Sequence, residues 1–119
     1  MSSFATILKS LVDRVPGAIG AIFADWEGEA VDQFAHVPAL EIQLAGAHWG
    51  IVRQLASQHL RAAGAGDVEE MWIDCEGGLV LLRRVTDRCY VVLTTRRGVH
   101  LGTARRELER GAMTLLGEM

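Results

Sequence analysis

The sequence lacks the residue arrangements that enzymes and nucleotide-binding proteins usually show. It has no G-x-x-x-x-G-K-[ST] loop, no serine within a G-x-S-x-G turn and no H-x-x-x-H pair. His48 and His59 fall near one face of a predicted helix but lie about 16 Å apart, so they cannot share a metal within one chain. We therefore predict no catalytic residue, no metal site and no cofactor, and a protein that is not an enzyme.

Cysteine is scarce, and long hydrophobic runs are absent. Cys75 and Cys89 are the two cysteines, and both lie in apolar, strand-like segments. This pattern predicts buried free thiols in a reducing compartment rather than a disulfide framework. The first fifteen residues include Asp13 and no long apolar block, which fits neither a signal peptide nor a membrane span. We expect a cytoplasmic protein without a membrane partner.

An excess of positive charge is also missing. Twelve Lys and Arg residues against 15 Asp and Glu residues give a net charge of −3, so nothing overall attracts nucleic acid or an anionic membrane. Acidic residues crowd segment 25–41, and arginines crowd the last third. A surface of two signs favours a protein partner, although scattered solvated charge explains it equally well.

The arginines leave two further interpretations open. A guanidinium supplied in trans can stabilise the transition state of a GTPase, and the exposed turns offer candidates. The candidates are Arg83, Arg84, Arg88, Arg96 and Arg97. Against this stands pairing within the chain, with the acidic hairpin and with Glu107 and Glu109.

Hydrophobic periodicity and turn residues predict eight elements. These are a helix over 3–15, strands over 18–25 and 30–36, a long helix over 39–63, strands over 68–76, 79–85 and 88–95, and a helix over 100–117. Gly28 is expected to need a positive φ, Gly20 to allow close approach of a helix, and Gly77-Gly78 to form a tight turn. Residues 30–36 suit an edge strand.

This order predicts an α+β fold with one domain over residues 1–119. The short links suit a five-stranded antiparallel sheet in a three-layer α/β/α sandwich. We expect the long helix to cover one face of the sheet and the two terminal helices to cover the other.

The long helix carries more apolar surface than one sheet face can cover. One stripe holds Ala45, Trp49, Val52, Ala56 and Leu60, and the other holds Leu40, Leu44, Ala47, Ile51, Leu55 and Ala62. Together they span roughly 200° of the helix, about twice the usual apolar width. We therefore predict a homodimer that pairs these helices. The predicted interface residues are Leu44, Ala47, His48, Ile51, Leu55 and Trp72.

Three residues near this surface have alternative interpretations. Gly46 and Gly50 lie outside both stripes, where they either let another backbone approach or merely weaken the helix. Trp72 stands between two acidic residues of a strand, either as a half-covered core residue or as part of a contact surface.

Two segments together resemble the Roadblock dynein-light-chain family, and most closely its bacterial branch of small-GTPase regulators. They are "VPGAIGAIFADWEGEAV" and "GGLVLLRRVTDRCYVVLTT", and the resemblance extends over nearly the whole chain. The family pattern GxxGAxxxDxxG is filled by Gly17, Gly20, Ala21, Asp25 and Gly28, and Trp26 departs from it.

The resemblance implies a homodimer whose sheets join edge to edge at the third strand, with the central helices side by side. It also implies a Ras-like small GTPase as partner, which the dimer activates or scaffolds without inserting an arginine. We expect the polar strip of the long helix to contact the GTPase, through Arg53, Gln54, Ser57 and Arg61. The alternative is an adaptor or structural subunit of another complex without a GTPase.

Overall fold

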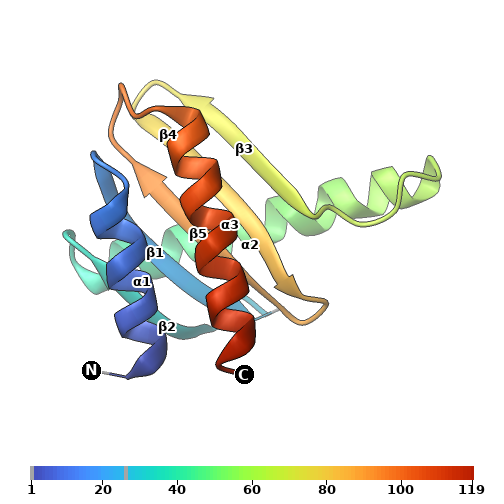
Figure 1. The fold of residues 1–119 in the computed structure, drawn as a ribbon. Helices are drawn as coiled ribbons and strands as arrows, with labels where there is room; N and C mark the ends of the chain where they lie inside the picture. Colours follow the sequence, from blue (N-terminus) through green and yellow to red (C-terminus); the bar gives the residue numbers. More distant parts are fainter. Residues whose placement is uncertain (1, 26) are drawn as a thin grey trace.

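The computed structural model describes residues 2–25 and 27–119 and has the predicted order of elements (Figure 1). The elements are α1 (Ser3–Arg14), β1 (Ala18–Asp25), β2 (Ala30–Ala35), α2 (Ala39–Ala62), β3 (Glu70–Cys75), β4 (Gly78–Thr86), β5 (Cys89–Thr95) and α3 (Leu101–Gly117). Trp26, the departure from the family pattern, lies outside the described residues.

The terminal helices begin at residues whose side chains cap them. The Ser2 hydroxyl accepts a hydrogen bond from the backbone N–H of Ala5, and the His100 ring accepts one from Thr103. Each cap satisfies a backbone donor that has no partner within the helix. Helix α1 begins at the predicted residue, whereas α3 begins one residue later than predicted because His100 is its cap.

The five strands form one antiparallel sheet in the order β2-β1-β5-β4-β3. Strands β1 and β5 are central, and β2 is an edge strand as predicted. Strand β3 is the other edge, so one side of its backbone has no neighbouring strand among the described residues. An unpaired edge of this kind is a template for pairing with another strand.

One turn differs from its prediction by a residue. Glu76 and Gly77 form the turn between β3 and β4, and Gly78 is already part of β4, paired with Cys75. A Cβ atom on Gly78 would lie 1.9 Å from the carbonyl oxygen of Thr95. The second glycine is therefore needed for close strand packing, not for the turn itself.

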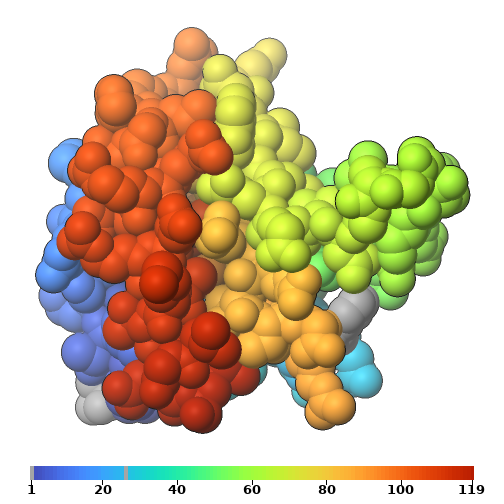
Figure 2. Space-filling model, turned by 45° about the vertical axis from the view of Figure 1, so that its right-hand side comes forward, coloured from blue at the N-terminus to red at the C-terminus, as the bar shows by residue number. Residues whose placement is uncertain are grey.

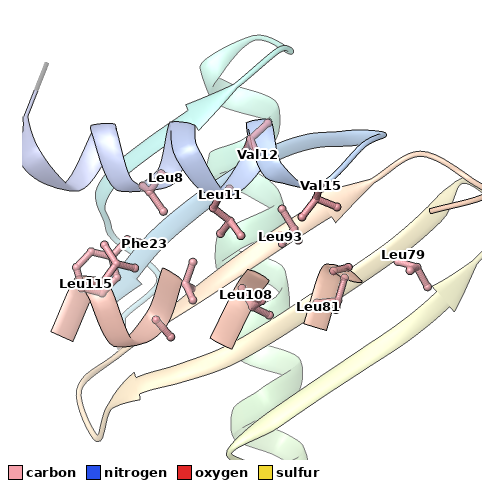
Figure 3. Close-up of a cluster of buried hydrophobic side chains, with 14 of the residues drawn as sticks. Leu8, Leu11, Val12, Val15, Phe23, Leu79, Leu81, Leu93, Leu108 and Leu115 are labelled. Atoms are coloured by element: carbon pink, nitrogen blue, oxygen red, sulfur yellow. The ribbon is translucent and has the colours of Figure 1, made fainter. Parts of the chain in front are cut away.

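Each face of the sheet carries its own apolar core. Between the sheet and helices α1 and α3 lie Leu8, Leu11, Val12, Val15, Phe23, Leu79, Leu81, Leu93, Leu108 and Leu115 (Figure 3). On the opposite face, Ile42 of α2 packs with Ile22, Leu82, Tyr90 and Val92. A Cβ on Gly20 would lie 3.2 Å from Ile42, so α2 approaches β1 closely, as predicted.

Helix α2 covers only part of its face of the sheet. It packs against β1, β2 and β5, and its C-terminal half then projects beyond the sheet (Figure 1). The projecting half forms a separate lobe in the space-filling view (Figure 2). Among the described residues, no helix combines the length and the apolarity needed to cross a bilayer.

Candidate interaction surface on helix α2 and strand β3

The side of α2 that faces the sheet consists mostly of small and polar residues. The buried residues of the helix are Ile42, Gly46, Arg53 and Ser57. A Cβ on Gly46 would lie 2.8 Å from Ile22, and one on Gly50 would lie 2.0 Å from the hydroxyl of Tyr90. The two glycines therefore permit close approach, but to the sheet of the same chain.

Tyr90 fixes the height of α2 above the sheet. Its buried hydroxyl donates a hydrogen bond to the carbonyl oxygen of Gly46, with the two oxygens 3.1 Å apart. Burial raises the pKa of Tyr90, and the negative charge of Asp25 raises it further. The phenol is held in the neutral form that this hydrogen bond needs.

The structure corrects two of the predicted GTPase contacts. Arg53 is 5% exposed and Ser57 is 1% exposed, so neither side chain is available to another protein. The reason is that both residues lie on the side of α2 that faces the sheet and the segment following the helix. Gln54 and Arg61, the other two predicted contacts, are exposed.

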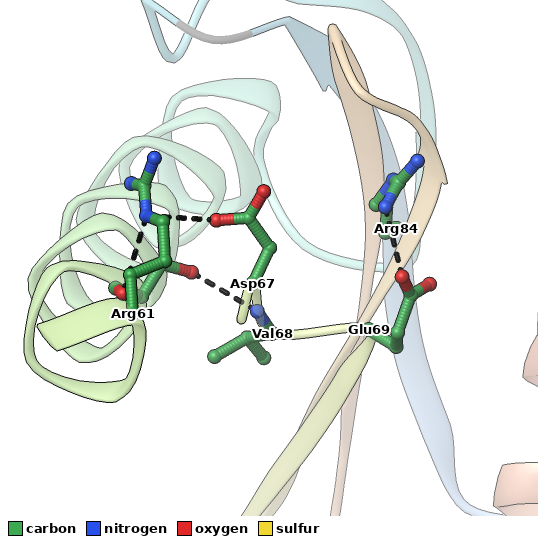
Figure 4. A network of polar contacts seen from close by, with 6 residues as sticks. Arg61, Asp67, Val68, Glu69 and Arg84 are labelled. Carbon is green, nitrogen blue, oxygen red and sulfur yellow. Dashed lines mark hydrogen bonds and ion pairs between the residues drawn. The ribbon is translucent and has the colours of Figure 1, made fainter. Parts of the chain in front are cut away.

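A polar network ties the end of α2 to the segment that leads into β3 (Figure 4). The Ser57 hydroxyl accepts a hydrogen bond from the backbone N–H of Val68, and Arg61 pairs with Asp67 at 3.0 Å. Burial lowers the pKa of the Arg53 guanidinium, while the charge of Asp67 opposes that shift. These contacts position the projecting half of the helix, which has little sheet beneath it.

The side of α2 opposite the sheet is apolar. Ile51 follows Ile42 by two and a half turns, as Leu55 follows Gly46, so both lie on the outward side. Four residues make up what we call the outer ridge, and their exposed fractions are large. They are Leu40 (64%), Leu44 (49%), Ile51 (55%) and Leu55 (53%).

A second apolar strip runs along one side of α2. We call it the flank, and it consists of Trp49, Val52, Ala56 and Leu60. Val52 is 38% exposed and Leu60 is 42% exposed, whereas Trp49 packs partly against the core beneath α2. His48 is exposed between the outer ridge and the flank. Most of the two predicted stripes is thus left uncovered, because the outer ridge faces away from the sheet and the sheet ends before it reaches Leu60.

Strand β3 presents different residues on its two faces. Ile73 pairs with Val80, which lies on the α2 side of the sheet. Trp72 pairs with Leu81, which belongs to the core under α1 and α3. The structure therefore does not bring Trp72 into one surface with the helix residues of the predicted interface.

The cysteines differ from each other in burial. Cys89 is a buried free thiol, as predicted, whereas Cys75 is free but exposed. Cys75 ends β3, and the edge position of this strand leaves its side chain without cover. The prediction of a buried Cys75 was wrong, because an apolar sequence around a residue does not reveal an edge strand.

Several C-terminal arginines pair with acids of β3 and α3. Arg105 makes a two-pronged contact with Glu70, at 2.8 and 3.2 Å. Arg83 lies between Glu70 and Glu109, and Glu107 accepts Arg106 and Arg110 at longer distances. These ion pairs support pairing with the last helix, and within residues 2–25 and 27–119 none joins an arginine to the acidic hairpin.

No protein-family model matches the chain, and no curated protein matches it. Solved structures do. A Roadblock/LC7 domain from Streptomyces avermitilis superposes with a TM-score of 0.89 at 14% identity, over 98% of both chains. MglB from Myxococcus xanthus gives 0.89 at 10% identity, over 99% of this chain and 95% of that one. MglC from the same organism gives 0.71 at 24% identity, over 99% and 100%.

These superpositions define the class of protein: the chain has the fold of Roadblock/LC7 domains. MglB superposes as well as the Streptomyces domain does. The fold that the resemblance implied is confirmed. A shared fold at such identities does not by itself carry over a partner or an activity.

Proposed function

We propose that this protein is a homodimeric, non-enzymatic regulator or scaffold of a Ras-like small GTPase in the cytoplasm. The single observation that carries the proposal is that α2 exposes large apolar side chains on two separate sides, the outer ridge and the flank. Scattered single apolar residues are normal on a protein surface, but contiguous patches mark contacts with partners. Two separate patches on one helix support two partners.

The flank and the free edge of β3 suit a second copy of the chain. If two β3 edges pair about a two-fold axis, the projecting half of each α2 extends over the sheet of the other copy. Leu60 would then cover apolar residues such as Ile73, which is 37% exposed on the α2 side. Full burial of two side chains of this size stabilises by about 3–6 kcal/mol per chain, before the cost of association.

This arrangement reassigns part of the predicted interface. Leu44, Ile51 and Leu55 belong to the outer ridge, which points away from the sheet and so away from a helix lying beside it. Both outer ridges of such a dimer would face the same side. We assign this double ridge to the GTPase, with the exposed Gln54 and Arg61 at its rim.

The proposal is tested with the purified protein and the Ras-like GTPase from the same organism. The GTPase is loaded separately with GDP and with a non-hydrolysable GTP analogue, and binding is measured by interferometry. We expect a preference for one nucleotide state and loss of binding in the variant Ile51→Glu, which should remain a dimer by light scattering. Met113→Glu, which changes an exposed apolar residue of α3 on the other side of the sheet, is the matched control.

Equal or absent binding in the two nucleotide states would contradict regulation of a GTPase. A dimer that binds no GTPase would favour the alternative, an adaptor subunit of another complex. GTP hydrolysis followed in the same mixtures distinguishes an activator, which accelerates it, from a scaffold, which leaves it unchanged.

A further inference from the structure

The sheet face opposite α2 carries a cleft that the proposed function does not use. The cleft has a volume of about 300 Å³ and lies between the end of β3 and the segment joining β5 to α3. Its lining includes Trp72, Asp74, Leu79, Arg96, Arg97 and Leu101. Because Trp72 points to the α1 and α3 side of the sheet, this cleft and the outer ridge lie on opposite sides of the molecule.

The apolar part of the cleft has an exposed indole at its edge. Trp72 is 44% exposed, whereas Leu79 is 8% exposed and belongs to the core. Leu101, at the start of α3, is partly buried against the same core. A ligand side chain seated here would contact the indole on one side and aliphatic groups on another, which is the environment of an anchor residue.

The charged part of the cleft consists of two arginines. Arg96 and Arg97 are exposed, and neither forms an ion pair with another of the described residues. This separates them from Arg83 and Arg105, which contact acids of the chain. Two neighbouring guanidinium groups without acidic partners favour a ligand with negative charge.

The wall that carries these arginines is held in place by hydrogen bonds. The Thr95 hydroxyl accepts from the N–H of Leu79 and donates to the carbonyl oxygen of Arg96. The N–H of Arg96 donates to the carbonyl oxygen of Gly17 at 2.8 Å. Thr95 is 3% exposed, so these bonds are shielded from water. A fixed wall reduces the entropy lost when a ligand binds.

We propose that this cleft binds an acidic peptide segment of a partner protein, with one apolar or aromatic residue seated against Trp72. The acidic groups of the peptide pair with Arg96 and Arg97. Asp74, a carboxylate at the β3 end of the cleft, repels negative charge and so directs the acidic groups toward the arginines. The cleft lies within one chain, and the inference is independent of the GTPase assignment.

The test uses fluorescein-labelled pentapeptides that have two acidic residues on each side of a central Phe, Leu or Trp. Fluorescence anisotropy measures their binding to the full chain. The control peptides carry Asn and Gln in place of Asp and Glu. We expect at least one acidic peptide to bind with a Kd below about 1 mM. We also expect its affinity to fall with added salt and to exceed that of its neutral control.

Variants of the cleft make the test specific. We expect Trp72→Ala and the double change Arg96→Gln, Arg97→Gln each to weaken binding about tenfold. Asp74→Asn should strengthen it, because the like charge is removed. Arg88→Gln is the control for loss of an arginine outside the cleft, since Arg88 is exposed in the turn between β4 and β5, at the other end of β5. This control should leave the affinity unchanged.

Three results would overturn the inference. They are equal binding of acidic and neutral peptides, no binding of any acidic peptide at about 1 mM, and equal loss in the Arg88→Gln control. Light scattering of Trp72→Ala provides a further check. A mass unchanged from that of the parent protein agrees with the inference, whereas conversion of a dimer to a monomer would place Trp72 in the dimer interface instead.

Discussion

Leu60 follows Ile42 by about five turns on the same side of α2, yet Ile42 is 2% exposed and Leu60 is 42% exposed. The helix has left the sheet between the two residues. An apolar side chain on the sheet-facing side is therefore uncovered because the sheet ends, not because the helix has turned. This relationship underlies our assignment of the flank to a second copy of the chain.

The first prediction concerns that second copy. We expect Leu60→Glu and Val52→Glu each to convert the dimer into a monomer, since each places a charge where apolar groups would be buried. Ile51→Glu, on the outer ridge, should leave the dimer intact. Multi-angle light scattering of the three variants measures the mass directly. If Ile51→Glu were a monomer and Leu60→Glu a dimer, the dimer interface would be the one predicted from the sequence, and our assignment of the flank would be contradicted.

The second prediction concerns the polar network at the end of α2. Ser57→Ala removes the acceptor of the buried Val68 N–H and should lower the free energy of unfolding by about 1–3 kcal/mol. Hydrogen exchange should accelerate at Val68. Ser10→Ala, a partly exposed change in α1, is the control and is expected to matter less. Urea denaturation measures the difference, and equal losses in both variants would contradict a structural role for Ser57.

The third prediction concerns the pH dependence that Tyr90 contributes. The pKa of the Tyr90 hydroxyl is raised in the folded state. Above about pH 10 the unfolded chain therefore loses the hydroxyl proton while the folded chain keeps it. The folded state then binds more protons, and stability falls as the pH rises through this window. Tyr90→Phe should make the fall shallower above pH 10 and cost about 1 kcal/mol at neutral pH, through the lost bond to Gly46.

The measurement for Tyr90 is urea denaturation between neutral pH and about pH 11. The parent chain and the variant differ by one hydroxyl, so the difference between their two curves isolates this residue. Parallel curves would show that Tyr90 does not titrate differently in the two states.

The fourth prediction concerns the close contact between α2 and β5. Gly50→Ala places a Cβ 2.0 Å from the Tyr90 hydroxyl, so the helix must lift or the ring must move. Overpacking of this kind costs about 1–3 kcal/mol, even though alanine favours helix. Gly117→Ala at the end of α3 serves as the control, because its Cβ would have no atom of a described neighbour within 4 Å. Thermal unfolding should show a lower Tm for Gly50→Ala alone, and an unchanged Tm would contradict the tight fit.

The sequence predicted the apolar surface of α2 but not the side of this helix that packs against the sheet. The excess of apolar residues on α2 was visible from periodicity, because large side chains recur on two sides of one helix. The side that faces the sheet was not visible from periodicity. Its residues do not form an apolar pattern, since they include Gly46, Gly50, Arg53 and Ser57. Their packing follows from what lies beneath them: Ile22 lies against Gly46, Tyr90 lies against Gly50, and the N–H of Val68 donates a hydrogen bond to Ser57. A buried side of this kind is recognised only when the residues packed against it are also known.

By itself, the sequence determined the order of elements, the two layers of helices and the α+β fold. Those features follow from local periodicity and turn residues, which each segment carries within itself. Only the tertiary structure decided which side of α2 meets the sheet, where the sheet ends beneath it, and that Trp72 and Arg96 line one cleft. Each of these depends on contacts between segments far apart in the chain, where the shape of one surface selects its neighbour.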